Sequence, residues 1–402
     1  MGIIVQKYGG SSVATTEKIR AIAERVVETK REGHEVVVVV SAMGDATDEL
    51  LAKAHEVAAA PDRRELDMLL SVGERISMAL LAMAIRERGA EAVSLTGSQS
   101  GIITTASHTN ARIMEVRPFR VQDELDAGRV VIVAGYQGVS YKRDITTLGR
   151  GGSDTTAVAL AAALEAEACE IYSDVDGVFT ADPRVAPNAS NLPEIGYAEM
   201  QELAEAGAKV LCAQAVEFAK RKNIAIYARK TGAKTPGTVV RTNAPSAPNG
   251  VRGVAHERQV AAIAAETTLP VVRTFVRAVD DLGVGLKQQT LTLHGERASF
   301  SAVVSMDEYG PGLVSRIAEH FGSEAVRLDC GAVSLVGEGI MQTQDVLLRA
   351  LGVLDALGAE VAGMSTSSFR LTLLVASEHV TEVVGALHEA LVRGGRAVAV
   401  IG

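Results

Sequence analysis

Short β-branched apolar runs alternate with longer segments of helical period over roughly the first 240 residues of this 402-residue chain. The longest apolar runs, such as Val36–Val40, have the length of a buried strand. This alternation predicts an α/β fold, a three-layer sandwich whose central, mainly parallel sheet lies between helical layers. We expect strands at Ile3–Lys7, Glu35–Ser41, Ala92–Leu95, Val130–Ala134, Glu170–Ser173 and Ile224–Tyr227, and helices at Thr16–Arg31, Glu65–Arg88 and Thr155–Glu167.

The pattern changes after Arg241–Gly253, a segment rich in Pro, Gly and Asn that is typical of a linker. Two similar βαββαβ-like orders follow, with little sequence identity between them. The sequence predicts a catalytic domain over residues 1–243, a linker over 244–256, and ferredoxin-like modules over 257–330 and 331–402. The expected strands are Val260–Ala265, Val284–Leu293, Ala298–Ser305, Ala332–Val336, Glu360–Ser365, Arg370–Ala376 and Ala397–Ile401, and the expected helices are Val271–Asp281, Gly312–Phe321, Gln342–Leu357 and Val380–Val392.

Composition argues against several classes of partner. The net charge is −9, from 40 basic and 49 acidic residues, which disfavours a nucleic-acid-binding surface. Apolar stretches of about 18 residues are absent and the N-terminus enters a strand pattern directly, so neither a membrane span nor a secretion signal is expected. The three cysteines lie far apart, which predicts no disulfide and no protein-built metal site, and favours the cytoplasm.

The first motif that carries chemistry is Lys7-Tyr8-Gly9-Gly10-Ser11-Ser12, between an expected strand and an expected helix. Adjacent glycines let the backbone approach an anion, a helix N-terminus adds partial positive charge, and Lys7 adds a full charge. These parts fit a turn that cradles phosphate, although an ordinary turn with a surface lysine explains the hexapeptide equally well. The Walker A and GxGxxG patterns are absent, so P-loop and Rossmann chemistry are not supported.

A second motif, Gly149-Arg150-Gly151-Gly152-Ser153-Asp154, precedes an Ala-rich helix. Ser153 or Asp154 can cap that helix, and the guanidinium of Arg150 offers a planar fork for a carboxylate or a phosphate. Capping alone does not explain an arginine among three glycines, so we favour a binding role.

A third motif, the acidic turn from Ser173 to Arg184 (SDVDGVFTADPR), follows the strand expected at Glu170–Ser173. Open α/β sheets bind ligands at the carboxyl ends of their strands, which is where this turn lies. Asp-Gly and Asp-Pro are also ordinary turn chemistry, which alone favours a structural role. Two Gly-rich anion sites near fixed cations, with an acidic turn in the same domain, together fit the transfer of a phosphoryl group between two anions.

In this order, KYGGSSVA, SAMGDATDELL, GERIS, GRGGSDTTAVALAAAL and SDVDGVFTADPR closely resemble the motifs of the aspartate kinase family, within the amino-acid kinase superfamily, from Ile3 to about Val240. The resemblance implies an eight-stranded, mainly parallel sheet followed by two tandem ACT modules. It also implies that ATP, with Mg²⁺ bridging its phosphates, phosphorylates the side-chain carboxylate of L-aspartate to give 4-phospho-L-aspartate and ADP. The product would serve lysine, threonine and methionine biosynthesis, or a dedicated secondary pathway.

The resemblance implies a role for each matching residue. Lys7 would stabilise the transferring phosphoryl group, Arg150 would pair with the α-carboxylate of aspartate, and Glu74, with Asp154, would receive its ammonium group. Lys7, Arg150 and Asp154 would thus be catalytic. The aspartate side would be lined by Ser41, Thr47, Glu74, Arg150, Gly151, Gly152 and Ser153. The nucleotide side would be lined by Lys7, Tyr8, Gly9, Gly10, Ser173, Asp174, Phe179, Asp182, Arg184, Lys209 and Val210.

The chain departs from the family pattern chiefly beyond residue 210. Cys212–Gln214 and Tyr227–Thr231 differ from the usual stretches, and Leu269–Val271 stands where Pro-Gly normally precedes the first ACT helix. We therefore hypothesise that feedback inhibition by lysine or threonine is weakened, or that the amino-acid effector at the ACT modules has changed. Titration of each amino acid against the initial rate would test this hypothesis. Pairing of ACT modules predicts a homodimer or a larger homo-oligomer.

Two other functions are compatible with parts of the pattern. A superfamily kinase acting on another carboxylate is disfavoured, because Glu74 and Arg150 match the ammonium and carboxylate groups of an α-amino acid. A non-catalytic subunit that only binds amino acids is disfavoured, because Lys7, Arg150, Asp154 and Asp174 are all present.

Overall fold

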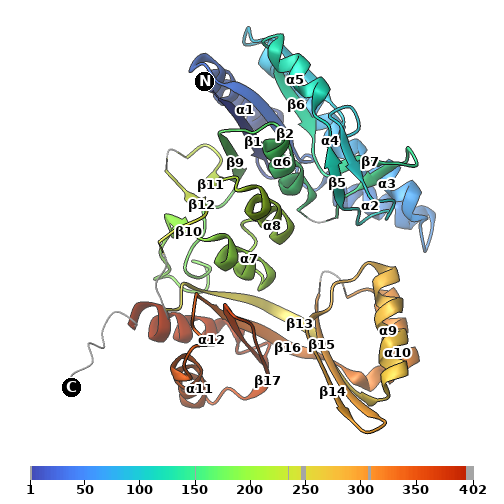
Figure 1. Cartoon of the computed structure of the whole chain (residues 1–402), viewed down its shortest axis with the longest axis vertical. Coiled ribbons are helices and arrows are strands. Elements are labelled where there is room, and N and C mark those ends of the chain that lie inside the picture. The colour runs from blue at the N-terminus through green and yellow to red at the C-terminus, as the bar shows by residue number, and fades with distance from the viewer. Residues whose placement is uncertain (1, 150, 234, 246–249, 307–308, 395–402) are drawn as a thin grey trace. The chain divides into compact units, whose positions relative to one another are not determined.

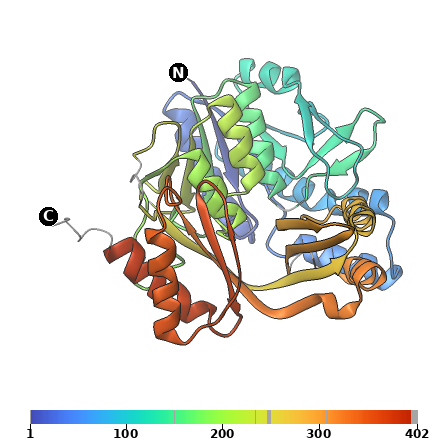
Figure 2. The same ribbon diagram turned by 60° about the horizontal axis from the view of Figure 1, so that its bottom comes forward.

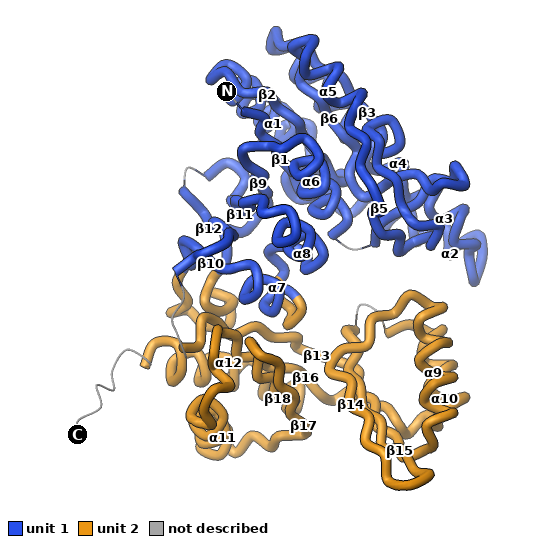
Figure 3. Tube along the Cα trace, viewed as in Figure 1, with its two compact units in different colours: residues 1–178, 191–204, 209–246 blue, residues 179–190, 205–208, 247–402 orange. Residues whose placement is uncertain are grey.

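The computed structural model describes residues 2–149, 151–233, 235–245, 250–306 and 309–394. The chain forms two compact units (Figure 3). Unit 1 comprises residues 1–178, 191–204 and 209–246, and unit 2 comprises residues 179–190, 205–208 and 247–402. Arg150, residues 246–249 of the predicted linker and the predicted strand Ala397–Ile401 lie outside the described residues.

An eight-stranded sheet forms the centre of unit 1, in the order β10-β12-β11-β9-β1-β2-β6-β3 (Figure 1). The strands from β11 to β3 are parallel, whereas β12 and β10, at one edge, run in the opposite direction. All five valines of Val36–Val40 are buried, as a central strand covered on both faces requires. This confirms the predicted mainly parallel α/β sheet. The strands are β1 (Ile3–Tyr8), β2 (Glu35–Val40), β3 (Ala92–Leu95), β6 (Val130–Ala134), β9 (Ala168–Ser173), β10 (Glu194–Ile195), β11 (Ile226–Lys230) and β12 (Thr238–Val240).

Helices cover both faces of this sheet. On one face, α1 and α4 pack against each other and share a core with the side chains of Tyr8 and Val38. On the other face, α6 packs against β1, β2 and β9, and α8 packs against α6. The helices that begin in unit 1 are α1 (Thr16–Arg31), α2 (Ala46–Val57), α3 (Arg63–Leu70), α4 (Val72–Arg86), α5 (Phe119–Asp126), α6 (Gly152–Ala163), α7 (Tyr197–Glu205) and α8 (Ala213–Lys222).

The helix predicted over Glu65–Arg88 is interrupted, giving the two helices α3 and α4. At the junction, the hydroxyl of Ser71 donates to the carbonyl of Met68 at 3.0 Å, a local bond that competes with the helical ladder. Gly73 then lets α4 approach the turn after β2, because a Cβ at this glycine would lie 2.7 Å from the Cβ of Ala42. The interruption therefore brings the start of α4 against the carboxyl edge of the sheet.

The segment Arg63–Arg86, which contains α3 and α4, is long and apolar enough to cross a membrane. Half of its most apolar stretch is buried within the protein, and α4 packs on β2, β3 and β6. These contacts are those of a core helix in a soluble protein.

A small four-stranded sheet, in the order β5-β4-β7-β8, adds to unit 1 and is missing from the sequence prediction. Its strands have three or four residues each, too few for alternation of apolar and polar residues to reveal them. Its last strand leads directly into the Gly149–Asp154 motif. The strands are β4 (Ile102–Thr104), β5 (Ile113–Val116), β7 (Gln137–Ser140) and β8 (Ile145–Thr147).

Unit 2 contains a six-stranded antiparallel sheet, in the order β14-β15-β13-β16-β18-β17. Its helices form two pairs, α9 with α10 and α11 with α12, which lie side by side in both views (Figures 1 and 2). The elements are β13 (Gly253–Thr267), α9 (Leu269–Leu282), β14 (Lys287–His294), β15 (Arg297–Ser305), α10 (Pro311–Phe321), a 3-10 turn (Ser323–Ala325), β16 (Val326–Val336), α11 (Asp345–Leu357), β17 (Val361–Thr366), β18 (Arg370–Ala376), α12 (Val380–Leu387) and a π-helical turn (His388–Arg393).

Two long strands, β13 and β16, run through both hydrophobic cores of unit 2. Ile263 of β13 packs in the core under α9 and α10, whereas Val254 of the same strand packs in the core under α11 and α12. The order β13-α9-β14-β15-α10-β16 is the expected βαββαβ, and β16-α11-β17-β18-α12 repeats it as far as the described residues reach. The domain limits remain a prediction, and those at 257 and 331 fall inside these two strands.

Candidate active site

The carboxyl edge of the parallel sheet brings the predicted motifs together. In the register of β1 with its neighbours, Tyr8 pairs with Val40 of β2 and with Tyr172 of β9. The residues that follow these strands are held side by side, because Gly9 N–H donates to the Tyr172 carbonyl and Ser41 N–H donates to the Tyr8 carbonyl, both at 3.1 Å. The three strand ends therefore form one continuous rim.

A buried ion pair lies at this rim. Nζ of Lys7, on β1, lies 2.6 Å from Oδ1 of Asp154, in the first turn of α6. Both residues are less than a tenth exposed. Taking two opposite charges out of water is costly, so a buried pair of this kind contributes little to stability and favours a functional explanation.

The two glycines after β1 have different surroundings. A Cβ at Gly10 would lie 3.1 Å from the carbonyl oxygens of Ala42 and Gly44, so this glycine permits close contact between the turns after β1 and β2. A Cβ at Gly9 would lie 3.5 Å from Nζ of Lys7. The Gly9 amide already donates to the carbonyl of Tyr172, and the missing Cβ keeps a carbon atom out of van der Waals contact with the ammonium group of Lys7.

Glu74, in the first turn of α4, is a buried carboxylate with one oxygen unpaired. Its Oε1 accepts a hydrogen bond from the N–H of Ala42 at 3.2 Å, and its Oε2 has no hydrogen-bond partner in the described part of the chain. The residue is 3% exposed, and burial raises the pKa of its carboxyl group to about 7. A buried, unpaired carboxylate oxygen is suited to receiving a cation from a ligand.

The turn before α6 differs from the prediction, which placed the helix start at Thr155. The helix begins at Gly152, so Ser153 and Asp154 lie within its first turn and are not its caps. The cap is Gly151, whose φ of 72° is left-handed and favours glycine. A Cβ at Gly151 would also lie 2.5 Å from the Cβ of Cys212.

Two residues predicted on the aspartate side follow β2. Ser41 is the first residue after this strand, and Thr47 lies in the first turn of α2; both side chains are partly exposed. Gly152 is also tightly enclosed, because a Cβ there would lie 2.7 Å from the Cβ of Leu148. All the described residues predicted for this side therefore belong to unit 1.

The nucleotide-side predictions are divided between the units. Ser173 is the last residue of β9, the exposed Asp174 follows it, and Lys209 and Val210 follow α7, all in unit 1. By contrast, Phe179, Asp182 and Arg184 belong to unit 2. The residues predicted for the nucleotide side therefore do not all lie in one unit.

The unit 2 residues form a compact acidic–basic turn. The guanidinium of Arg184 contacts both carboxylate oxygens of Asp182, at 2.7–3.2 Å, and this hydrogen bonding lowers the pKa of the carboxyl group. The turn is anchored by Thr180, whose hydroxyl lies 2.9 Å from Nε2 of the buried His388.

Tyr8 is placed differently from its prediction. Its ring is fully buried and stacks on Tyr172, with the ring centroids 4.8 Å apart, on the face of the sheet covered by α1. The Tyr8 ring therefore packs in the core beneath the strand ends, and its side chain does not line the nucleotide side.

Two hydroxyl residues at the rim received no role from the sequence, although one of them, Ser12, lies in the first motif. The hydroxyls of Ser12 and Thr231 are 2.7 Å apart, and Thr231 N–H donates to the carbonyl of Ser173 at 2.8 Å. The available signal was position: Thr231 directly follows β11, the parallel neighbour of β9.

Among the residues that the structure describes, no group of three or more His, Cys, Asp or Glu side chains could hold a metal ion.

Comparison with known proteins identifies the family. Residues 2–229 match the model of the amino acid kinase family. Aspartokinase from Mycolicibacterium smegmatis is 46% identical over 417 aligned residues, which cover 100% of this chain and 99% of the relative. The chain belongs to the aspartokinases.

Solved aspartokinase structures share the fold of this aspartokinase. Escherichia coli aspartokinase III, solved with aspartate and ADP in its R-state, has a TM-score of 0.82 at 24% identity, with 97% of this chain and 100% of that chain covered. The same enzyme with lysine and aspartate in its T-state has a TM-score of 0.72 at 25% identity, with 97% and 99% covered. The predicted family and fold class are therefore confirmed, and this aspartokinase is a kinase.

Proposed function

We propose that this aspartokinase transfers the γ-phosphoryl group of ATP to the side-chain carboxylate of L-aspartate, giving 4-phospho-L-aspartate and ADP. The observation that carries the proposal is the Lys7–Asp154 ion pair on the same sheet edge as the unpaired Glu74 carboxylate. An ammonium group beside an open glycine fits phosphoryl transfer, and a buried carboxylate fits recognition of an α-ammonium group.

In this mechanism a carboxylate oxygen of aspartate attacks the γ-phosphorus, and the bond to the β-phosphate oxygen breaks to release ADP. Lys7 offsets the negative charge that moves onto the phosphoryl and leaving oxygens, and Asp154 fixes the position of its Nζ. Glu74 holds the ammonium group of aspartate, with Ser41, Thr47 and the Gly151–Ser153 turn around it. Arg150 is proposed to bind the α-carboxylate.

Mg²⁺ fits this site as an ion carried by the nucleotide. Kinase sites commonly hold Mg²⁺ through substrate phosphates and one or two carboxylates, and do not need a protein-built cage. Asp174, exposed directly after β9, is the carboxylate proposed to contact it. When bound, the ion would neutralise phosphate charge.

The remaining proposals concern regulation and assembly. The lysine bound to Escherichia coli aspartokinase III supports an amino-acid effector for this chain. We place that effector at the ACT-like modules of unit 2, with the altered feedback hypothesised from the sequence departures. Pairing of these modules would give a homodimer or a larger homo-oligomer. The cytoplasm is the proposed location.

Trapping the acyl phosphate tests the reaction. The protein is incubated with ATP, Mg²⁺ and a panel of amino acids, and ADP release is measured together with hydroxamate formation in hydroxylamine. We expect both products with L-aspartate and neither with its N-acetyl derivative, which lacks the ammonium group. Formation of a hydroxamate from another amino acid alone would favour the alternative function, a superfamily kinase that acts on a different carboxylate.

Lys7→Ala tests the catalytic assignment. We expect kcat to fall by about 100- to 1,000-fold or more, because Lys7 acts on charge that develops in the transition state. Lys222→Ala, an exposed lysine at the end of α8, is the matched control and should leave kcat unchanged. Equal activity of the two variants would remove Lys7 from the mechanism.

A further inference from the structure

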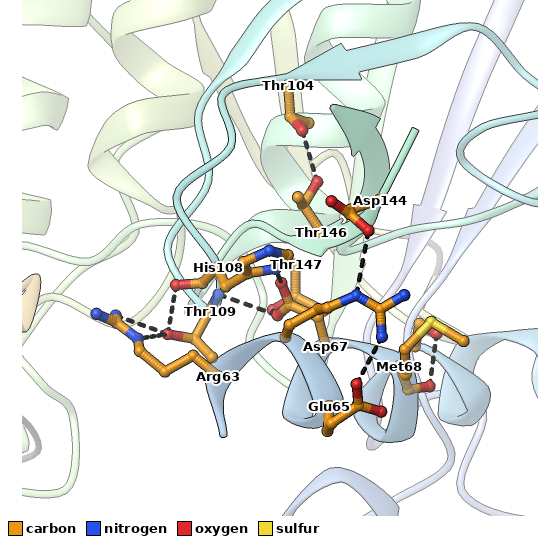
Figure 4. A network of polar contacts seen from close by, with 12 residues as sticks. Arg63, Glu65, Asp67, Met68, Thr104, His108, Thr109, Asp144, Thr146 and Thr147 are labelled. Atoms are coloured by element: carbon orange, nitrogen blue, oxygen red, sulfur yellow. Dashed lines mark hydrogen bonds and ion pairs between the residues drawn. The ribbon is translucent and has the colours of Figure 1, made fainter. Parts of the chain in front are cut away.

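Asp67, on α3, is a fully buried carboxylate that the proposed mechanism does not use. Its Oδ1 accepts hydrogen bonds from the N–H of Thr109 at 3.0 Å and from the hydroxyl of Thr147 at 2.5 Å (Figure 4). Its Oδ2 lies 2.6 Å from Nδ1 of His108. Burying a carboxylate is costly unless donors surround it, and here three donors converge on one group from two distant segments.

Backbone strain at the same place is an independent observation. Thr109 has a φ of 66°, a left-handed conformation that a β-branched residue rarely adopts. Its N–H is held by Asp67, and its hydroxyl accepts hydrogen bonds from Nε and a terminal nitrogen of Arg63 at 2.9 and 2.7 Å (Figure 4). Such strain persists only where neighbours over-determine the conformation, which is frequent around functional sites.

The loop that contains His108 and Thr109 braces the turn that leads to Asp154. Ala111 N–H donates to the carbonyl of Thr147 at 2.9 Å. Two residues further on, a Cβ at Gly149 would lie 3.0 Å from Oδ1 of Asn110. Gly152, the first residue of α6, donates its N–H to the carbonyl of Gly149 at 3.1 Å. The loop therefore contacts both the end of β8 and the glycine turn before α6.

Asp67 also connects to the other side of the proposed aspartate site. Its own carbonyl accepts the N–H of Ser71 at 3.0 Å, at the junction between α3 and α4. Glu74 lies three residues beyond that junction. The bond to Ser71 is an ordinary helical one, whereas the carboxylate of Asp67 links α3, the helix that precedes Glu74, to β8, the strand that precedes Asp154.

We propose that Asp67, His108 and Thr147 form a positioning network that sets the Gly149–Asp154 turn relative to Glu74. The network touches neither substrate. The inference rests on the proposed function and deepens it. It states that residues outside the proposed aspartate site hold the groups of that site in position.

Thr146 and Thr147, adjacent on β8, offer a matched test. Both are fully buried, and each hydroxyl makes a side-chain hydrogen bond at 2.5 Å: Thr147 to Asp67, and Thr146 to Thr104 (Figure 4). Substitution by valine keeps the shape and the branching at Cβ and removes only the hydroxyl. The two variants therefore each remove one buried hydroxyl from the same strand: that of Thr147 donates to the network carboxylate, and that of Thr146 bonds to a neutral hydroxyl outside the network.

For Thr147→Val we expect kcat/KM for aspartate to fall about 10- to 100-fold, because small displacements of positioned groups have effects of this size. The KM for ATP should stay within about twofold, because the network holds the aspartate side. Thr146→Val should leave both constants near wild type, and Thr147→Ser, which keeps the hydroxyl, should restore kcat/KM. Thermal unfolding of all variants shows whether folding is retained.

If Thr147→Val does not fold, His108→Gln provides the same comparison from the partly exposed side of the network. Equal effects of Thr147→Val and Thr146→Val on kcat/KM, or a parallel rise in both substrate KM values, would overturn the positioning role. Failure of the proposed function is distinguishable, because the wild-type protein would then yield no aspartyl hydroxamate.

Discussion

At the scale of single residues, the site is defined by which carboxylates are paired. Asp154 is paired with Lys7, whereas Glu74 keeps one oxygen unpaired within the described chain. The neighbouring Arg75 donates instead to Gln137 at 3.3 Å, so Glu74 and Arg75 are not the solvated pair that their adjacency in a helix would suggest. Burial raises the pKa of Glu74 and outweighs the lowering effect of the hydrogen bond from Ala42.

The raised pKa of Glu74 predicts a pH dependence of aspartate binding. Only the ionised carboxylate attracts an ammonium group, so kcat/KM for aspartate should rise as the pH increases through about 7. Glu74→Gln should lower kcat/KM and flatten this rise. Initial rates across pH at low aspartate measure both effects, and an unchanged profile in the variant would assign the titration to another group.

The same shift predicts the sign of a stability change. Because the folded-state pKa of about 7 lies above the ordinary 4.5, the folded protein retains a proton that the unfolded chain releases. The contribution of Glu74 to the free energy of unfolding is therefore lost as the pH rises from about 4.5 to 7. Glu74→Gln should remove this loss, which denaturant unfolding at several pH values would show.

At the scale of elements, the glycine turn before α6 combines two constraints. Gly151 has a positive φ and lies against Cys212, whereas Gly89, after α4, has a φ of 79° with no atom within 4 Å of a built Cβ. Gly89 therefore has only the positive φ, whereas Gly151 has both the positive φ and a close neighbour.

Substituting each glycine by alanine separates these two costs. Gly89→Ala should lower the free energy of unfolding by roughly 1–2 kcal/mol, the usual cost of a left-handed L-residue. Gly151→Ala should cost roughly 1–3 kcal/mol more, because its Cβ must displace Cys212. Denaturant unfolding checks the difference, and equal losses would mean that Cys212 relaxes freely.

Local pattern predicted most of the elements but less of the site. The bounds of α1, β3 and β6 agree with their sequence predictions; α1 has a strong helical period and β6 is a continuous apolar run. The small sheet around β8 escaped prediction because its strands are short. Its network escaped as well, since Asp67 and Thr147 are 80 residues apart and no local pattern encodes their contact. Lys7 and Asp154 were found because glycines mark their turns.

At the scale of the whole molecule, the proposed nucleotide residues Phe179, Asp182 and Arg184 belong to unit 2. Their segment packs Ala181 and Ala186 into the core under α11 and α12. Thr180 anchors it further, since its hydroxyl contacts His388 and accepts the N–H of Ser190 at 3.0 Å. Nucleotide affinity should therefore depend on the packing of unit 2.

Thr180→Val tests this dependence in the full-length protein. Loss of both hydroxyl contacts should loosen the 179–190 segment and raise the KM for ATP by about 3- to 10-fold, in line with about 1 kcal/mol for a lost hydrogen bond. The KM for aspartate should not change. Thr274→Val, at an exposed position of α9, serves as the control. A rise in both KM values would contradict the assignment of this segment to the nucleotide.

The continuity of β13 and β16 limits how unit 2 can respond to a ligand. Each strand supplies side chains to two cores. The two strands pair along their length, with register shifts between Glu257 and Ala262. Neither module can be excised intact: a chain truncated at residue 331 would leave Gly253–Glu257 of β13 without the β16 residues that pair with them. A ligand that changes the position of either strand in one module therefore also acts on the core of the other module, because the same two strands supply both.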